Sequence, residues 1–332
     1  MSLPPPPQVD AVLLLSFGGP EKPDDVVPFL ENVTRGRNIP RERLETVAAQ
    51  YMRFGGRSPI NDECRSLVRA LRDELARSGP PLPVYWGNRN WAPMLADTVG
   101  EMARDGVKRA VAITTSAYSS YSACRQYLED IERARAAVGA SAPVIEKIPP
   151  YWNTRGFLET MITNTRAALA ANDAAAFAAS RPETGGGVRL VFTAHSLPVE
   201  MAARCRYEDE LRKASAIVAA RVLPGTRWKL AFQSRSGSPS QPWLEPDIDD
   251  HLRTLAAAGV SRVVIVPIGF VADHMEVVYD LDVLARAVCD SVGILMTRAA
   301  CVGSAHRFVS GLRDLVANHV ERPRACAPDC CT

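Results

Sequence analysis

The chain has 332 residues, with 39 lysines and arginines against 37 aspartates and glutamates, and a formal net charge of +2. This length suits roughly two domains of ~150 residues each. The near-neutral balance excludes a protein that coats nucleic acid with a broadly basic surface, so we expect no nucleic-acid partner. No apolar run approaches the ~20 residues that a membrane helix needs, so we expect no transmembrane segment.

The two ends of the chain differ from the rest. The start, MSLPPPPQVD, lacks a positive segment followed by an apolar core and is therefore unlike a signal peptide. We expect a cytoplasmic protein, in which the eight cysteines are not a disulfide framework. Three of them lie in the last seven residues: Cys326, Cys330 and Cys331. Residues 1–8 are expected to be a disordered tail, and residues 323–332 a second, cysteine-rich tail.

Short apolar runs typical of buried strands alternate with helical patterns along the whole chain. The predicted strands are, in chain order, residues 11–16, 84–86, 108–114, 144–148, 188–193, 229–232, 260–267 and 293–297. Leucines at 67, 71 and 75 repeat with helical spacing, as do Phe308, Leu312 and Val316. The alternation predicts an α/β protein with parallel sheets covered by helices on both faces. Right-handed crossovers then bring the strand carboxyl ends to one edge of each sheet.

The prolines at 149 and 150 indicate a domain boundary, because the residue before a proline is disfavoured in helix. We therefore expect a first domain over 9–150 and a second over 151–303, of similar size. The stretch 172–187 is small, polar and ends in three glycines, which predicts a flexible connection inside the second domain. Residues 304–322 are expected to form a C-terminal helix that returns to the first domain.

Polar segments rich in serine, glycine and aromatic residues follow five of the predicted strands. They are SFGGP (16–20), TTSAYSSYS (114–122), TAHSLP (193–198), FQSRSGSPSQPWLEPD (232–247) and PIGFVADHMEVVYD (267–280). Ligand pockets at the edge of a parallel sheet have this character. The motifs G-x-G-x-x-G, G-x-x-x-x-G-K-[ST], H-E-x-x-H and G-x-S-x-G are absent from the sequence. Their absence argues against a nucleotide oxidoreductase, a P-loop ATPase, a zincin and an esterase.

The five histidines differ in their positions. His195 comes at the end of a predicted strand, where its side chain would enter a crevice; a purely structural histidine at that junction is the alternative. His274 and Glu276 follow another strand in the same relative place, and Asp273 is either part of that site or a helix cap. The remaining histidines are interpreted as surface residues: His251, His306 and His319.

A histidine and a carboxylate that face one crevice from two strand ends would handle a metal ion or a proton. A neutral imidazole binds first-row metals and accepts protons near neutral pH. Two ligands are fewer than the closed four-ligand shell of a structural zinc site. His195 and Glu276 therefore suit transient delivery of a metal ion better than permanent storage.

Five ordered motifs together resemble the ferrochelatase family from about residue 10 to 320: LLLSFGGPEKPDDVVPFLENVTRGR, YMRFGGRSPIN, FTAHSLP, FQSRSGSPSQPWLEPD and PIGFVADHMEVVYDLD. The similarity is greatest to the actinobacterial branch, which uses coproporphyrin III. The resemblance implies two similar Rossmann-like, chelatase-type domains with an active-site cleft between them. It also implies a lyase of haem biosynthesis that inserts Fe²⁺ into a porphyrin, with coproporphyrin III and Fe²⁺ as its partners. Transient contacts with neighbouring enzymes of the pathway are compatible with it.

The resemblance also assigns roles to single residues. His195 matches the active-site histidine, a metal ligand and proton acceptor, and Glu276 matches its carboxylate partner. Residues at propionate-holding positions are Arg35, Ser58 and Tyr127, with Arg37 a weaker candidate. Two substrate-binding positions depart from relatives: Phe17 replaces a metal-ligating tyrosine, and Gln50 replaces an arginine. Asp280 and Asp282 match part of an outer row of acidic residues leading to the site, which Leu284 interrupts.

Many members of the family hold a [2Fe–2S] cluster by three C-terminal cysteines and one internal cysteine. The resemblance therefore implies a cluster on Cys326, Cys330 and Cys331, with Cys124 as the preferred fourth ligand and Cys205 as the second choice. Four thiolates are a common ligand set for such clusters. Chance thiols and a zinc site remain alternatives.

Three functions stay open from the sequence. The leading hypothesis is a coproporphyrin III ferrochelatase, since the segment RGRNIPRER is basic rather than apolar and suits a substrate with four carboxylates. A protoporphyrin IX ferrochelatase is the alternative within the class. A non-catalytic haem-binding or iron–sulfur sensor is the alternative from another class.

Overall fold

The computed structural model describes residues 9–36, 39–178, 187–236 and 241–321, in which all strand pairing is parallel. One four-stranded sheet has the order β2-β1-β3-β4, and a second has the order β6-β5-β7-β8. The strands of the first are β1 (Ala11–Ser16), β2 (Val84–Asn88), β3 (Arg109–Thr114) and β4 (Val144–Lys147). Those of the second are β5 (Arg189–His195), β6 (Trp228–Gln233), β7 (Arg262–Val266) and β8 (Leu295–Arg298). The predicted α/β fold with parallel sheets is confirmed, and every predicted strand overlaps one of these.

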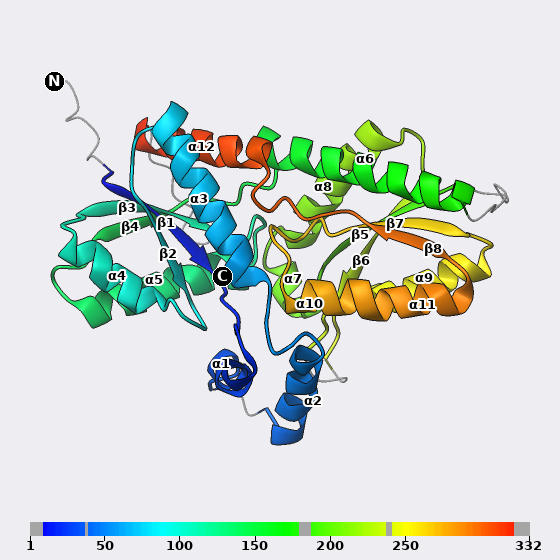
Figure 1. Ribbon diagram of the computed structural model, residues 1–332, viewed down its shortest axis with the longest axis horizontal. Helices are drawn as coiled ribbons and strands as arrows, with labels where there is room; N and C mark the ends of the chain where they lie inside the picture. Colours follow the sequence, from blue (N-terminus) through cyan, green and yellow to red (C-terminus); the bar gives the residue numbers. More distant parts are fainter. Residues whose placement is uncertain (1–8, 37–38, 179–186, 237–240, 322–332) are drawn as a thin grey trace.

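Helices cover both faces of the two sheets (Figure 1). In the first half of the chain they are a short 3₁₀ turn η1 (Pro23–Asp25), α1 (Val26–Val33), α2 (Arg41–Met52), α3 (Ile60–Ser78), α4 (Leu95–Arg104), a π-helical turn η2 (Tyr121–Arg125) and α5 (Gln126–Val138). In the second half they are α6 (Arg155–Ala178), α7 (Val199–Ala203), α8 (Tyr207–Val222), α9 (Ile248–Ala257), α10 (Met275–Val277), a π-helical segment η3 (Val278–Ala285), α11 (Arg286–Val292) and α12 (His306–Glu321).

The central strand β1 shows why the sheets are layered. All six of its residues are buried. Val12 and Leu14 join a core cluster with α3 and α12, whereas Leu13 and Leu15 join a separate cluster with α4 and α5. Successive side chains of a strand point to opposite faces, so a continuous apolar run demands helices on both sides.

One hydrophobic cluster connects the two halves of the molecule. It contains Val111 of the first sheet and Phe192 of the second, together with Phe308 of α12. Helix α12 crosses α6 closely, because a Cβ atom built on Gly156 would lie only 2.8 Å from the Cα of Gly311. Glycine permits this approach, and α12 thereby runs back beside α3 of the first half (Figure 1). Helix α12 thus contacts helices of both halves.

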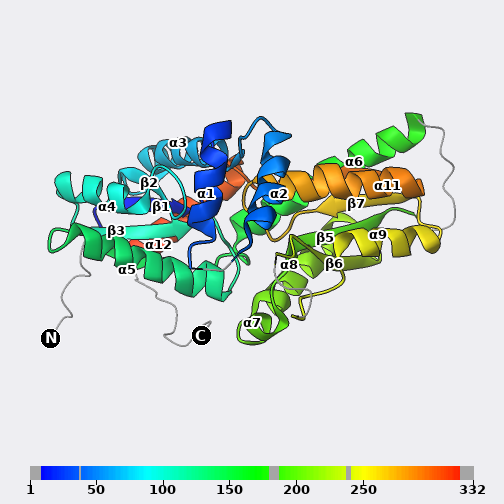
Figure 2. The same ribbon diagram turned by 90° about the horizontal axis from the view of Figure 1, so that it is seen from below.

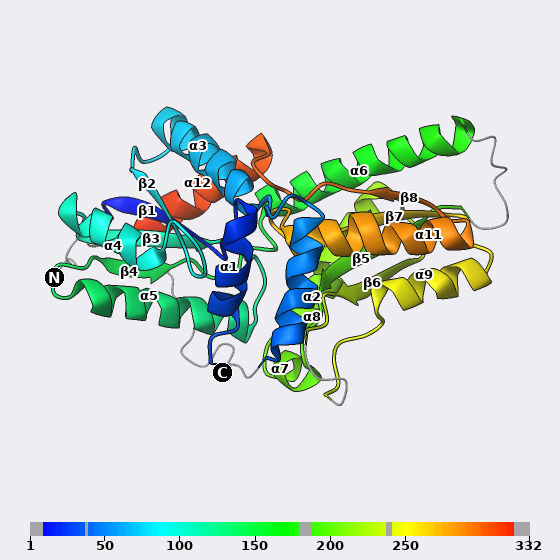
Figure 3. The same cartoon turned by 60° about the horizontal axis from the view of Figure 1, so that its bottom comes forward.

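Helices α1 and α2 form a separate lip that lies apart from both sheets (Figure 1), and the view from below shows them next to each other (Figure 2). They pack on each other, and Figure 3 shows them side by side between the two halves. A small apolar cluster joins Phe29 of α1 and Tyr51 of α2 with Met275 of α10, which belongs to the second half. The lip therefore bridges from the first half to the second.

Several expectations need correction or fall outside the described residues. The flexible connection predicted at 172–187 begins too early, because α6 continues through residue 178, and the buried amide of Asn172 donates to the carbonyls of Val263 and Leu295. Residues 179–186, both predicted tails and Arg37 lie outside the described residues. Within the described residues, no helix combines the length and apolar character needed to cross a membrane.

His319 is buried, contrary to its interpretation as a surface residue. Its Nε2 lies 2.8 Å from Oε2 of Glu146 on β4, and Arg109 contacts the same carboxylate. His319 shares the helix face of Phe308, Leu312 and Val316, and the packing of α12 onto the first half covers that face. The end of α12 is thereby fixed beside β4.

Candidate active site

His195 is the last residue of β5 and points from the carboxyl end of the second sheet. Its Nδ1 lies 2.6 Å from the carbonyl oxygen of Ser196. Because a carbonyl oxygen only accepts hydrogen bonds, Nδ1 must carry the hydrogen, and the lone pair of the neutral ring is on Nε2. Tyr207 donates to the His195 carbonyl at 3.0 Å, and the Ser196 amide donates to the carbonyl of Gln233 at 2.8 Å. The backbone on both sides of the imidazole is thus fixed.

Glu276 faces this lone pair from the second residue of α10. Its Oε2 lies 3.6 Å from Nε2 of His195, which is longer than a hydrogen bond. The His195 side chain is 30% exposed and that of Glu276 is 50% exposed. Gln233, directly beside His195 in the sheet register, donates from Nε2 to the Glu276 carbonyl at 3.3 Å. The two predicted residues therefore meet, with solvent access, at the carboxyl edge of one sheet.

Asp280 lies four residues beyond Glu276, in the π-helical segment η3. The hydroxyl of Ser234 donates to its Oδ2. The pKa of Asp280 is raised to about 6, mainly by burial and also by the charge of Glu276, although the Ser234 hydrogen bond opposes the shift. Ser234 has a φ of 61°, and among the described residues it is the one non-glycine residue in the left-handed region. Such strain persists where the surrounding structure holds it, and here it aims Oγ at the carboxylate.

Asp273 and Asp282 do not extend the row of acidic residues at Glu276 and Asp280. Arg298, at the end of β8, donates to both oxygens of Asp282 at 2.7 and 2.8 Å. It also donates to both oxygens of Asp273 at 3.0 Å. Asp273 is therefore an ion-pair partner and not a helix cap, since the residue before α10 is His274 and no side chain caps that helix. Of the two matched aspartates, Asp280 extends toward Glu276, whereas Asp282 is engaged by Arg298.

The lip approaches the same site from the first half of the chain. Burial, and then the negative charge of Glu276, raise the pKa of the Tyr51 hydroxyl far above its usual value. Tyr51 is therefore a neutral phenol near the carboxylate. The guanidinium of Arg53 lies 5.7 Å from the ring centre of Tyr279, three residues beyond Glu276. The end of α2 thus stands opposite the segment that carries the acidic residues.

Phe17 and Tyr127 lie on either side of one arginine at the edge of the first sheet. The guanidinium of Arg89 is 5.9 Å from the Phe17 ring centre and 4.9 Å from that of Tyr127. Its Nε lies 2.8 Å from Asp130, and both side chains of that pair are about nine-tenths buried. Phe17 is 41% exposed, whereas Tyr127 is only 4% exposed and packs in the core beneath β1 and β3. Phe17 therefore presents a ring to the surface, and Tyr127 supports Arg89 from inside.

The other predicted propionate contacts are scattered over the lip and its base. Arg35 is exposed just after α1 and contacts Asn32. Ser58 is buried, with its amide donating to the Pro20 carbonyl at 2.9 Å. Gln50 is half-buried near the end of α2. These positions surround the lip rather than forming one contact set with His195.

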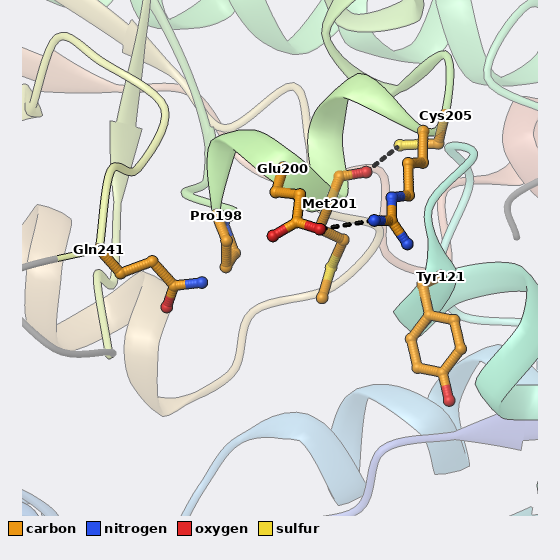
Figure 4. Close-up of a pocket in the computed structure, with 7 residues that line it drawn as sticks. Tyr121, Pro198, Glu200, Met201, Cys205 and Gln241 are labelled. Carbon is orange, nitrogen blue, oxygen red and sulfur yellow. Dashed lines mark hydrogen bonds and ion pairs between the residues drawn. The ribbon is translucent and has the colours of Figure 1, made fainter.

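The two candidate internal cysteines lie in different settings. Cys124 is 2% exposed in η2, whereas Cys205 is half-buried after α7. Cys205 borders a cavity of about 240 Å³ between η2 and α7 (Figure 4). Its thiol donates to the carbonyls of Met201 and Ala202 at 3.5 Å. The cavity is lined by Tyr121, Pro198, Glu200, Met201, Arg204, Cys205 and Gln241. Cys326, Cys330 and Cys331 lie outside the described residues.

Sequence reasoning missed four residues around the candidate pair: Tyr51, Gln233, Ser234 and Arg298. Gln233 and Ser234 stand in a strand-end segment that the sequence does mark as polar. Tyr51 and Arg298 carry no such signal, because their contacts join segments far apart in the chain. Over the described residues, no group of three or more His, Cys, Asp and Glu side chains is arranged to hold a metal.

Comparisons with known proteins agree with the resemblance. A family model described as ferrochelatase matches residues 9–320. A protein of Frankia alni named coproporphyrin III ferrochelatase is 49% identical over 97% of this chain and 86% of its own length. Proteins with the same name from Streptomyces coelicolor (49% identity, 92% and 84% covered) and Mycobacterium marinum (51%, 93% and 86%) are similar as well.

Among solved structures, that of CbiX, the terminal enzyme of sirohaem biosynthesis in denitrifying bacteria, is 16% identical with a TM-score of 0.47. The match covers 92% of this chain and 97% of that one.

Proposed function

The chain belongs to the ferrochelatase family, and on that premise we propose that it inserts Fe²⁺ into coproporphyrin III, giving Fe-coproporphyrin III (coproheme). The observation that carries the proposal is the free lone pair of His195 Nε2, 3.6 Å from a half-exposed carboxylate at the sheet edge. The naming of several relatives near 50% identity supports the choice of substrate.

The chemistry needs a proton acceptor and a weak metal ligand. Two pyrrole N–H protons leave the macrocycle as Fe²⁺ enters, and the oxidation state of iron does not change. His195 Nε2 accepts a pyrrole proton, because a neutral imidazole is a base near neutral pH. Glu276 receives the ion and helps it to shed water, and its exposure lets protons return to solvent. Asp280 is the next carboxylate outward.

Substrate choice depends on the groups around the lip. The exposed guanidinium of Arg35 favours a substrate with four carboxylates, since arginine pairs well with planar carboxylates. The exposed apolar side chains Val27 and Met52 on the same lip favour protoporphyrin IX as the second candidate. Coproporphyrin III is preferred because the relatives near 50% identity are named as coproporphyrin III ferrochelatases.

The test is anaerobic turnover with Fe²⁺ and either porphyrin, followed by the porphyrin absorbance. We expect faster insertion into coproporphyrin. Faster insertion into protoporphyrin IX would make that porphyrin the substrate. No insertion above the uncatalysed rate would contradict the enzyme and favour the non-catalytic sensor.

We further propose that Cys124, Cys326, Cys330 and Cys331 hold a [2Fe–2S] cluster. The described residues fit this group in two ways: Cys124 lies in the first half, and α12 ends there, with His319 bonded to Glu146 of β4. Cys326 is the fifth residue after Glu321, a reach of up to ~17 Å. Such a cluster supplies a one-electron redox centre, and metal insertion has no step that needs one.

Removal of the residues after Arg322 should abolish the visible absorption of the cluster. Cys124→Ser should do the same while Cys205→Ser retains the colour. Colour that survives in Cys124→Ser but not in Cys205→Ser would assign the fourth ligand to Cys205.

A further inference from the structure

Arg298, at the end of β8, contacts one residue before Glu276 in the chain and one residue after it. Its side chain is 14% exposed, and its guanidinium makes four hydrogen bonds of 2.7–3.0 Å. Two go to Asp273, three residues before Glu276, and two go to Asp282, six residues after it. Paired contacts of this kind between guanidinium and carboxylate fix orientation as well as distance.

Besides these contacts, the segment between the two aspartates is held by apolar packing: Val277 and Leu281 are fully buried in the core of the second half, and Met275 packs against the lip. Helix α10 has only three residues and passes directly into the π-helical segment η3. π-helical geometry is rare and is found mostly in short stretches. The backbone carbonyl of Glu276 accepts a weak hydrogen bond of 3.3 Å from Gln233. The Glu276 carboxylate faces His195 without bonding to it, so its place is set by the backbone, which the apolar packing and the bridge of Arg298 hold together.

Arg298, Asp273 and Asp282 together are called the clamp below, and the groups packed around it keep Arg298 charged. The thiol of Cys301 donates to Oδ1 of Asp273 at 3.1 Å, and burial holds the pKa of that thiol well above its usual value. Burial alone would lower the pKa of Arg298, but its hydrogen bonds to Asp282 and Asp273 outweigh this and raise it. Glu63 approaches from α3, and burial and the charge of Asp273 raise its pKa. The clamp is therefore a permanent brace rather than a pH switch.

We propose that Arg298 is a positioning residue for the metal-delivery step, because its bridge between Asp273 and Asp282 holds Glu276 at the correct distance from His195. The inference rests on the proposed iron insertion and adds a residue that touches neither porphyrin nor iron. It predicts a selective defect. Use of Fe²⁺ should weaken while porphyrin binding is retained, since the clamp lies behind the carboxylate and not at the lip.

The main test is Arg298→Lys in the full-length protein. Lysine keeps the charge but cannot make paired contacts to two carboxylates. We expect the KM for Fe²⁺ to rise about tenfold, in line with the loss caused by removing a second partner behind a metal ligand. The KM for coproporphyrin should stay within about twofold of wild type. Co²⁺ titrated without porphyrin, followed by its visible absorption, should bind about tenfold more weakly, and His195→Ala should remove this signal.

Arg286→Lys is the matched control. Arg286 also joins the helical segment to β8, but it donates to the Met296 carbonyl at 3.1 Å and not to a carboxylate. This variant should keep the wild-type KM for Fe²⁺. A triple variant, Arg298→Leu with Asp273→Asn and Asp282→Asn, removes the clamp without leaving buried charges unpaired. It should fold, as judged by its thermal midpoint, and still show the weak use of Fe²⁺.

The outcomes separate the two proposals. Wild-type Fe²⁺ kinetics and Co²⁺ affinity in both clamp variants would overturn the role of Arg298. An equal rise of both KM values would also overturn it, since the defect would then be general. If the unmodified protein inserts no iron, the proposed function fails, and the Co²⁺ titrations still decide whether Arg298 positions Glu276.

Discussion

The two sheets have the same strand order but opposite characters at their carboxyl edges. In each sheet the first strand in sequence is central and pairs with the second on one side and the third on the other. The edge of the first sheet carries the ion pair of Arg89 and Asp130, whose side chains are 8% and 10% exposed. The edge of the second carries His195 and Glu276, both open to solvent.

This difference teaches that topology selects where a site forms, whereas the residues after each strand select its chemistry. A buried and paired charge is fixed in place and suits a rigid wall. Exposed and unpaired groups can take up and release a proton or an ion. The first edge therefore supports the lip and the ring of Phe17, and the second edge carries the reactive groups.

The largest effect should come from the reactive edge. His195→Ala removes the lone pair at Nε2, and we expect turnover to fall by about 10²–10⁴-fold, the usual contribution of a positioned base. The thermal midpoint should change little, because the ring is partly exposed. His306→Ala, at an exposed histidine of α12, is the control. Near-normal turnover in His195→Ala would remove the imidazole from the mechanism.

Substitutions in the buried ion pair at the edge of the first sheet should change the free energy of unfolding and not the reaction rate. Arg89→Met leaves the carboxylate of Asp130 buried without its main partner, and we expect a loss of about 3 kcal/mol in the free energy of unfolding. Arg133→Met removes a largely exposed contact to the same carboxylate and should cost less than about 1 kcal/mol. Urea unfolding measures both. Equal losses would mean that burial does not distinguish the two contacts.

Glu276→Gln keeps the shape of the side chain but removes its charge. We expect kcat/KM for Fe²⁺ to fall about 10–100-fold, because an amide oxygen is a poorer ligand for a cation than a carboxylate. Porphyrin binding, measured by fluorescence without iron, should be unchanged. A loss confined to porphyrin binding would mean that Glu276 contacts the porphyrin and does not bind the metal ion.

The smallest effect concerns pH. The folded-state pKa of Asp280 is about 6, above the usual 3.8, so the native state binds this proton more tightly than the unfolded state. Its protonated form stabilises the fold, and that stability is lost as pH rises from about 4 to 6. Asp280→Asn should therefore raise the free energy of unfolding at pH 7.5 by about 1–2 kcal/mol, allowing for partial exposure.

Asp282→Asn is the matched control for this prediction. It weakens the contacts to Arg298 and should destabilise the protein at pH 7.5. Denaturant midpoints measured from pH 4 to 8 compare the two variants. Destabilisation by Asp280→Asn at neutral pH would contradict the raised pKa.

Much of the fold and of the candidate site can be predicted from the sequence. Apolar runs such as 11–16 and 188–193 located the strands, and the position of His195 at a strand end located the reactive edge. Tyr127 shows the limit, because its motif position suggests a substrate contact although its ring packs in the core beside Arg89. Asp273 shows it again, since a site role or a local cap was expected and an ion-pair partner 25 residues away was found.

The sequence by itself determined the layered α/β fold and the family, because burial on both faces of a strand and the order of motifs are properties of short segments. It also named His195 and Glu276. Only the tertiary structure decided which charges are buried and paired, that α10 and η3 join Glu276 and Asp280 in one continuous segment, and that Arg298 bridges Asp273 and Asp282 across it. These facts depend on contacts between segments far apart in the chain, whose geometry is fixed by the packing of helices and sheets and not by local pattern.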